Sequence, residues 1–562
     1  MFQTRTILLA LTCLSIYCGQ PVTQSKSQDS LKIEDADLAC DRNTTPPSDS
    51  NFPKGFDYPK NQDVPTWVQN RKGHRIRVHA WCLFAGLNQH TNPSDPNSPF
   101  NWQTWKTSTQ AFPFQYNPWK SVVGEALPKR PVTLNSRNFA NAKAGGSNPI
   151  NNDPPVYPIR DKVASDYPKC AVPIPGFESR KWYQLNDGER MQSNGDIMVA
   201  GVIYNDAAIK HIHGKTRATP PLYNAVALNG RLPKGKNDPP NAIPWFPAAS
   251  IVLKPMFWPV QKNGYTVLPV WDWDAHKPGS AADGQYAGYE MQKFWTRAVA
   301  ITPIASVPPS TLQYLHGVWD STGSNQIGPI TYNSTDFQVV SVNDFYHRQL
   351  KKADLDALSP CDRALLDASA YWAYNRAFEP DDYVVLVAMH IMTKEQQDWT
   401  FQSLWYHPDA DNDSCRFCKW RPTNLTDKTF RHYLLTTTYG TTQGSGNNYY
   451  CPPNTPNCCP PNTQNCAVMW PVAYNPYIEL AASHPITTNC MNCHHRAAWP
   501  PVASQKKPDE GRTSSYLQDT PPNPNVLEKY PWGASIFNGL VTLDAMWAVS
   551  DRAGYPKGSK KR

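Results

Sequence analysis

Proline is the feature that most limits how this 562-residue chain can fold, because 55 of its residues are prolines. Proline lacks the backbone N–H that helix interiors and central strands use. Its share here is about twice that of an average protein. The chain also has 20 tryptophans and 27 tyrosines, whereas Leu-rich amphipathic stretches are scarce. This composition predicts a loop-rich β fold, and the length predicts at least two domains.

Short β-type runs bounded by Pro, Asn and Gly recur between residues 66 and 440, and they predict strands of a sandwich-like sheet. These runs are Ile197–Tyr204, Ala248–Leu253, Tyr265–Trp271, Phe294–Ile301, Tyr383–Ile391 and Tyr433–Thr438. One helix is predicted in the same region, because Ser359 suits an N-cap, Pro360 the first turn and Asp362 the capping-box position. The predicted fold class is therefore α+β.

The predicted domain organisation follows shifts in composition along the chain. It has a signal peptide at residues 1–19, a flexible leader at 20–65, a β-rich domain at 66–440, a Cys/Pro/Asn-rich linker at 441–469 and a small α-helical domain at 470–562. The leader is rich in Asp, Asn, Ser and Pro, a composition typical of disorder. The best helix of the last domain is expected at Ile536–Ser550.

The N-terminus has the pattern of a secretory signal peptide, with Arg5 before an apolar run from Ile7 to Ile16 and small and polar residues after it. The run is too short to span a membrane, and no other stretch approaches about eighteen apolar residues, so no transmembrane span is predicted. Lipid attachment at Cys13 or Cys18 is an alternative use of this segment. A periplasmic or otherwise exported protein is expected.

Cysteine usage agrees with export. Of the 14 cysteines, Cys13 and Cys18 lie in the signal peptide and Cys490 and Cys493 in the motif below, which leaves ten, enough for up to five disulfides. The ten are Cys40, Cys82, Cys170, Cys361, Cys415, Cys418, Cys451, Cys458, Cys459 and Cys466. The last four bound a tandem Pro- and Asn-rich repeat that needs crosslinks to hold a shape. Cys415 and Cys418 are expected to form a structural disulfide, with a redox pair or a zinc site as alternatives.

The pentapeptide Cys490-Met491-Asn492-Cys493-His494 has the spacing by which a polypeptide binds haem covalently. Two thiols add to the vinyl groups of the porphyrin, and the following histidine ligates the iron. Cys490 and Cys493 are therefore predicted to hold haem c, with His494 as the proximal ligand. The alternative is a short disulfide with an unrelated histidine. The related pair Cys415 and Cys418 is followed by Lys419, so it lacks the histidine.

About the last ninety residues resemble a c-type cytochrome domain, through this motif, the loop Trp499-Pro500-Pro501 and a C-terminal segment of helical pattern. The resemblance implies a small helical fold around one haem, electron transfer and iron as the metal. It also implies a second axial ligand, often a Met fifty or more residues after the histidine. Met546 stands at about that distance, although no Pro follows it. A core position for Met546 and an open axial site are the alternatives.

Other groups of polar or aromatic residues in the β-rich domain give weaker indications of a functional site. His211 and His213 would share one face of a strand and suit a metal. Asp272, Asp274 and His276 suit a cation or acid–base chemistry. The segment from Met389 to Glu395, with Trp399, Trp405, Tyr406 and His407 after it, is a candidate substrate or electron-transfer surface, with core packing as the alternative.

The formal charge of +8 is modest and scattered, apart from the basic tail at 557–562, which argues against a nucleic-acid partner and leaves a redox protein as the expected partner. The predicted function is an exported c-type cytochrome with one covalent haem that transfers electrons. One alternative is a haem-dependent oxidoreductase with a substrate site in the β-rich domain or at an open haem face. The other is a disulfide-rich binding protein without haem. The sequence contains no Gly-x-Ser-x-Gly, phosphate-loop or dinucleotide motif, which favours the electron carrier. The size of the β-rich domain leaves enzymatic activity open.

Overall fold

The computed structural model consists of two units, Met1–Glu34 and Asp35–Arg562, and all residues that it describes belong to the second. The described residues are 38–43, 45–48, 52–60, 63–70, 72–95, 97–114, 160–173, 183–185, 190–193, 198–271, 297–319, 325–396, 399–411, 417–439, 475–478, 490, 494, 497–500 and 537–556. The predicted signal peptide, the linker at 441–469 and Cys493 lie outside them.

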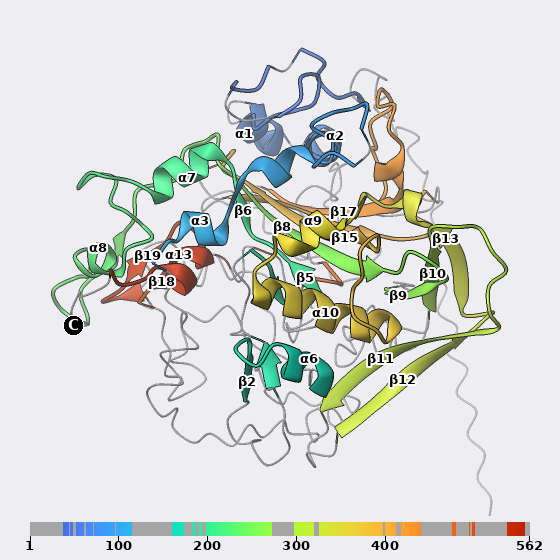
Figure 1. The fold of residues 1–562 in the computed structure, drawn as a ribbon. Coiled ribbons are helices and arrows are strands. Elements are labelled where there is room, and N and C mark those ends of the chain that lie inside the picture. Colours follow the sequence, from blue (N-terminus) through green and yellow to red (C-terminus); the bar gives the residue numbers. More distant parts are fainter. Residues whose placement is uncertain are drawn as a thin grey trace, which may run out of the picture. The chain divides into compact units, whose positions relative to one another are not determined.

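A long antiparallel sheet forms the centre of the described structure, in the order β1-β6-β8-β15-β16-β17, and β4, β5 and β14 pair along its sides (Figure 1). Its strands are β1 (Lys106–Thr107), β4 (Gln192–Ser193), β5 (Val199–Ala200), β6 (Ile203–Tyr204), β8 (Ile251–Val260), β14 (His347–Gln349), β15 (Tyr383–Thr393), β16 (Thr400–Tyr406) and β17 (Tyr433–Thr438). Strands β15, β16 and β17 are buried along almost their whole length, which explains their nearly continuous apolar or β-branched sequences.

Four smaller sheets surround this one among the described residues. They comprise β2 (Ala171–Pro173) with β3 (Tyr183–Leu185), β9 (Thr266–Val270) with β10 (Arg297–Thr302) and β13 (Phe337–Ser341), β11 (Thr311–Trp319) with β12 (Asn325–Asn333), and β7 (Asn241–Ala242) with β18 (Ala498–Trp499) and β19 (Val541–Thr542). The prediction of a β-rich, mixed α and β fold is thereby confirmed.

The described helices cover the sheets or fill their connections, with α2 and α10 on different sides of the main sheet (Figure 1). They are α1 (Asp63–Gln69), α2 (Gly73–Leu87), α3 (Ser108–Ala111), α6 (Asp161–Asp166), α7 (Asp206–Ile212), α8 (Ala225–Asn229), α9 (Lys352–Asp356), α10 (Pro360–Tyr374) and α13 (Trp547–Arg552), with 3-10 turns at Asn101–Thr104, Val342–Asp344 and Thr429–His432. None of the described helices is long and apolar enough to cross a membrane.

Helix α10 begins as predicted. The Ser359 hydroxyl accepts a hydrogen bond from the backbone N–H of Asp362, and Pro360 occupies the first turn. The helix ends at Tyr374, and Asn375 follows as the C-cap with a left-handed φ of 62°, which asparagine tolerates better than most residues.

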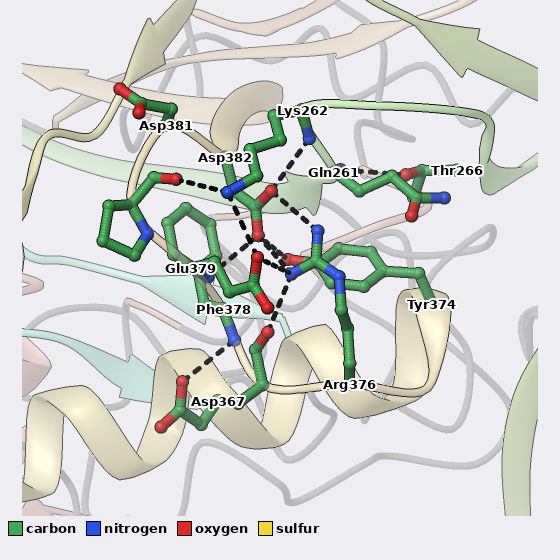
Figure 2. A network of polar contacts seen from close by, with 12 residues as sticks. Gln261, Lys262, Thr266, Asp367, Tyr374, Arg376, Phe378, Glu379, Asp381 and Asp382 are labelled. Atoms are coloured by element: carbon green, nitrogen blue, oxygen red, sulfur yellow. Dashed lines mark hydrogen bonds and ion pairs between the residues drawn. The ribbon is translucent and has the colours of Figure 1, made fainter.

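The turn between α10 and β15 is organised around the buried carboxylate of Asp382 (Figure 2). Arg376 donates two hydrogen bonds to it, at 2.6 and 2.8 Å, and the Tyr374 hydroxyl donates a third at 3.1 Å. The backbone N–H groups of Lys262 and Glu379 also donate to it. Burial alone would raise the pKa of Asp382, but these partners, Arg376 foremost, hold it below its usual value.

Two disulfides confirm the prediction that cysteines of this chain form crosslinks. Cys40 is bonded to Cys82 in α2, and Cys170 is bonded to Cys361 at the start of α10. Cys40 belongs to the segment predicted as a flexible leader, yet it is 3% exposed. The described residues of that segment from Leu38 onward are therefore attached to the core. Cys415 and the four cysteines of the tandem repeat lie outside the described residues, whereas Cys418 is half-buried beside the core.

The two faces of the main sheet have different neighbours. Leu253 of β8 pairs with Ile391 of β15, and Leu404 of β16 pairs with Met389, two residues away on the same face of β15. Leu253, Ile391 and Leu404 pack in the same cluster as Trp81 and Phe84 of α2. Because successive side chains of a strand alternate between faces, His390 and Met392 of β15 and Phe401 and Ser403 of β16 belong to the opposite face.

The described part of 470–562 is mixed in secondary structure and not all helical. Strand β19 precedes α13, and Asp544 and Ala545 between them have left-handed φ angles of 46° and 61°. Left-handed residues interrupt a helix, so the helix predicted at Ile536–Ser550 is wrong and only α13 forms. Strand β19 pairs with β7, and α13 shares a hydrophobic cluster with residues of α7, β8 and β16.

Candidate functional site

A hydrophobic cluster against the second face of the main sheet contains Cys490 and Met546, which are 8% and 2% exposed. Phe401 of β16 belongs to this cluster, and its ring lies 4.8 Å from that of His494. Three residues singled out in the sequence, Cys490, His494 and Met546, therefore occupy one region. Cys493 and His495 lie outside the described residues.

The imidazole of His494 is held in one orientation. Its Nδ1 lies 2.8 Å from the backbone oxygen of Ala545. A carbonyl oxygen only accepts hydrogen bonds, so Nδ1 carries the proton and Nε2 keeps its lone pair. Burial lowers the pKa of His494 to about 4, although the bond to Ala545 opposes this. The ring is therefore neutral near pH 7, which is the form that binds metals.

The Ala545 carbonyl is positioned by the residue before it. The Asp544 carboxylate accepts hydrogen bonds from the Lys394 ammonium at 2.6 Å and from the backbone N–H of Phe246 at 2.9 Å. Its backbone oxygen accepts a third, at 2.7 Å, from the indole N–H of Trp399. We call these three contacts the Asp544 clamp. They stabilise two left-handed residues, each of which costs about 1–2 kcal/mol outside glycine.

Lys394 completes the clamp from the end of β15. Its side chain and that of Asp544 are each 4% exposed. The ammonium group also lies over the rings of Trp245 and Trp399, 4.3 and 5.6 Å from their centroids. Aromatic faces attract cations, so the buried charge has a carboxylate on one side and ring faces on others.

A polar row crosses the sheet beside His494. The strand register places His390 of β15 between Lys254 of β8 and Ser403 of β16, and Thr436 of β17 follows Ser403. His390 is 9% exposed. Positive charge on His390 or Lys254 opposes protonation of His494 and contributes, after burial, to the low pKa of His494. These polar residues separate the apolar patch around Phe401 from the main core.

A second buried charged group lies on the face of the sheet that packs on α2. His79 of α2 contacts Asp57 through Nδ1 at 2.8 Å and Glu395 through Nε2 at 2.5 Å. Burial alone would lower the pKa of His79, but the two carboxylates raise it to about 9. The pKa values of both carboxyls are lowered by His79 against the effect of burial. All three groups are therefore charged at pH 7.

The other residues singled out in the sequence do not gather into a site. His211 and His213 lie on and just after α7 and not on a strand, and their Nε2 atoms donate to separate carbonyls, of Pro244 and Ala111. The metal pair predicted there is wrong, because the shared strand face that it required does not form and each ring is bonded to a different carbonyl. Trp405 and Tyr406 pack in the core. Asp272, Asp274 and His276 lie outside the described residues.

Within the described residues, no group of three or more His, Cys, Asp or Glu side chains is placed to hold a metal ion. A haem needs no such group, because the porphyrin supplies four of the iron ligands and the protein only the axial ones. Comparison with family models, curated proteins and solved structures finds no match to this chain.

Proposed function

We propose that this chain is an exported c-type cytochrome that binds one haem c and exchanges electrons with a redox partner protein. The observation that carries the proposal is the fixed tautomer of His494, whose Nδ1 is bonded to the Ala545 carbonyl, so that Nε2 keeps the lone pair that a metal needs. Metal-binding histidines characteristically donate their second ring N–H in this way, to a carbonyl or carboxylate. Cys490, four residues earlier, is buried in the adjoining cluster.

In this proposal Cys490 and Cys493 form the two thioethers and His494 is the proximal ligand. The bound haem supplies one-electron chemistry. The chain's own contribution is to keep the His494 ring neutral and oriented, and to surround it with apolar side chains such as Phe401 that exclude water. Exclusion of water and the hydrogen bond on the proximal ligand are both means by which proteins adjust a haem potential.

Export is supported by the two disulfides, since disulfides persist in oxidising compartments. Attachment of haem c also takes place outside the cytoplasm, so the N-terminal signal pattern and the Cys-x-x-Cys-His motif agree with each other.

Covalent attachment is tested by maturing the full chain in a periplasm that attaches haem c, then staining a denaturing gel for haem peroxidase activity. We expect a stained band that survives boiling and is lost in the variant with Cys490→Ala and Cys493→Ala. The control changes Cys415 and Cys418 to Ala, a Cys-x-x-Cys pair without the histidine, and should keep the stain. An unstained native band would refute the proposal.

A further inference from the structure

The hydrogen bond between His494 and Ala545 restricts which residue can complete the iron coordination. The two ring nitrogens of an imidazole point roughly 140° apart, so an iron on Nε2 would lie on the order of 7 Å from the Ala545 oxygen. A second axial ligand atom, beyond the iron, would lie about 9 Å from that oxygen.

Met546 cannot reach that position while the bond is kept. Its Cα is about 3 Å from the Ala545 oxygen, and an extended Met side chain adds about 4 Å to the sulfur, which gives roughly 7 Å in all. The side chain would also have to pass through the porphyrin plane. Met546 therefore lies on the proximal side with Ala545, and its 2% exposure is that of a core residue.

The contacts along the sheet show where the other axial side lies. Lys394 and Trp399 contact Asp544, beside Ala545. Met392 of β15 and Phe401 of β16 form the next pair along the same face of the sheet, and the Phe401 ring contacts His494. The next row on that face, about 7 Å beyond, contains His390 opposite Ser403. The direction from Ala545 through the His494 ring therefore continues toward His390.

We propose that His390 of β15, and not Met546, supplies the second axial ligand to the haem iron. The inference rests on the proposed function. His390 is buried on the face that His494 packs against, in the pair of residues that follows Met392 and Phe401 along that face. The central sheet would thus provide one ligand and the Cys-x-x-Cys-His segment the other. Two histidines give a lower potential than a histidine and a methionine.

The experiment uses the haem-loaded full chain and records absorption from the visible to the near infrared, with electron paramagnetic resonance of the ferric form. We expect the native protein to be low-spin without a sulfur-to-iron charge-transfer band, and Met546→Leu to leave both spectra unchanged. His390→Ala should become high-spin and bind carbon monoxide when reduced, and added imidazole should restore the low-spin spectrum. His390→Met should gain the sulfur-to-iron band.

The matched control is His211→Ala, another histidine that is 8% exposed but lies on α7, and it should keep the native spectrum. Far-ultraviolet circular dichroism reports whether each variant folds, and His390→Met replaces His390→Ala if the alanine variant does not fold. A native sulfur-to-iron band that Met546→Leu removes, ready carbon monoxide binding by the native protein, or a native spectrum in both His390 variants would overturn the inference. A native protein without covalent haem would instead refute the proposed function, and the gel stain distinguishes the two failures.

Discussion

Ala545 shows how one backbone group determines the tautomer of a buried imidazole. Its carbonyl fixes the tautomer of His494, yet the residue itself has an unfavourable left-handed φ. Sequence alone did not reveal this, because Leu543 to Trp547 has helical pattern. The conformation depends on Phe246, Lys394 and Trp399, which are all more than a hundred positions away in the chain. The Cys490, Cys493 and His494 prediction needed only local spacing.

The Asp544 clamp predicts strongly non-additive effects on stability. Asp544→Asn or Lys394→Met alone leaves one buried charge without its counter-ion, so each should lower the free energy of unfolding by about 3–5 kcal/mol. The double variant removes both charges and should lose less than the sum of the two changes. Chemical denaturation of the four proteins measures the coupling.

Asp409→Asn provides the comparison for an exposed pair. The Asp409 carboxylate is 47% exposed and pairs with Arg297 at 2.5 Å, so its replacement should cost less than about 1 kcal/mol. If the losses in unfolding free energy of the Asp544 and Lys394 variants simply add in the double variant, the interaction between these two side chains does not stabilise the protein.

At the scale of elements, the strands and α10 were predictable because their signals are local. The run Tyr433–Thr438 coincides with β17, and the Ser359 cap lies at the start of α10. Helix α2 was missed because it is buried on nearly all sides, which removes the polar stripe by which an amphipathic helix is recognised. The strand face that His211 and His213 would have shared does not form, because the Asn205 side chain caps a helix there by accepting a hydrogen bond from the backbone N–H of Ala208.

The turn between α10 and β15 provides a test with two neighbouring aspartates. Asp382→Asn should destabilise the protein by roughly 2–4 kcal/mol, since it removes the counter-charge of Arg376 and acceptors for several buried donors. Asp381→Asn should cost less than about 1 kcal/mol, because that carboxylate is 49% exposed in its pair with Lys351. Asparagine also tolerates the left-handed φ of 73° at position 381. Equal losses in the two variants would contradict the central role of Asp382.

The pH dependence at Asp382 has a definite sign. The folded pKa is lowered, so this group's contribution to stability is present above its unfolded pKa, about 4, and is lost as the pH falls through the folded value. The Asp382→Asn variant should accordingly lose less stability on acidification than the native protein.

For the whole molecule, segments far apart in the chain meet at the main sheet. Asp57 comes from the predicted leader, His79 from α2 and Glu395 from the end of β15, and they form one buried group. Composition suggested disorder before residue 65, because a polar segment rarely has a core of its own. The segment folds against a core supplied by others, aided by the Cys40 disulfide. Such long-range partners are not visible in local sequence patterns.

This group predicts a loss of stability at alkaline pH. The pKa of His79 is raised from 6.5 to about 9, so its contribution is fully present below pH 6.5 and is lost as the pH rises through 9. The pKa difference corresponds to about 3 kcal/mol in the free energy of unfolding. Denaturant titrations between pH 6 and pH 10 measure this loss.

Glu395→Gln is the control for that measurement, because it removes one of the two carboxylates that favour the charged imidazole. The variant should begin less stable, and its stability should change less between pH 6.5 and pH 9. A native protein and a variant with the same slope over this range would show that Glu395 does not favour the charged form of His79.

Lys394 and Glu395 are adjacent in sequence, yet each is buried with a partner of opposite charge, Asp544 for the lysine and His79 for the glutamate. Adjacent side chains at the end of a strand point to opposite sides. A slip of β15 by one residue would move each of them to the other face of the sheet. In one direction Glu395 would meet the Asp544 carboxylate, and in the other Lys394 would meet the charged His79. Either slip would bury two like charges side by side. The alignment of this strand is thus fixed by charge as well as by shape, and a one-residue insertion or deletion before Lys394 should be tolerated far less well than one in an exposed loop.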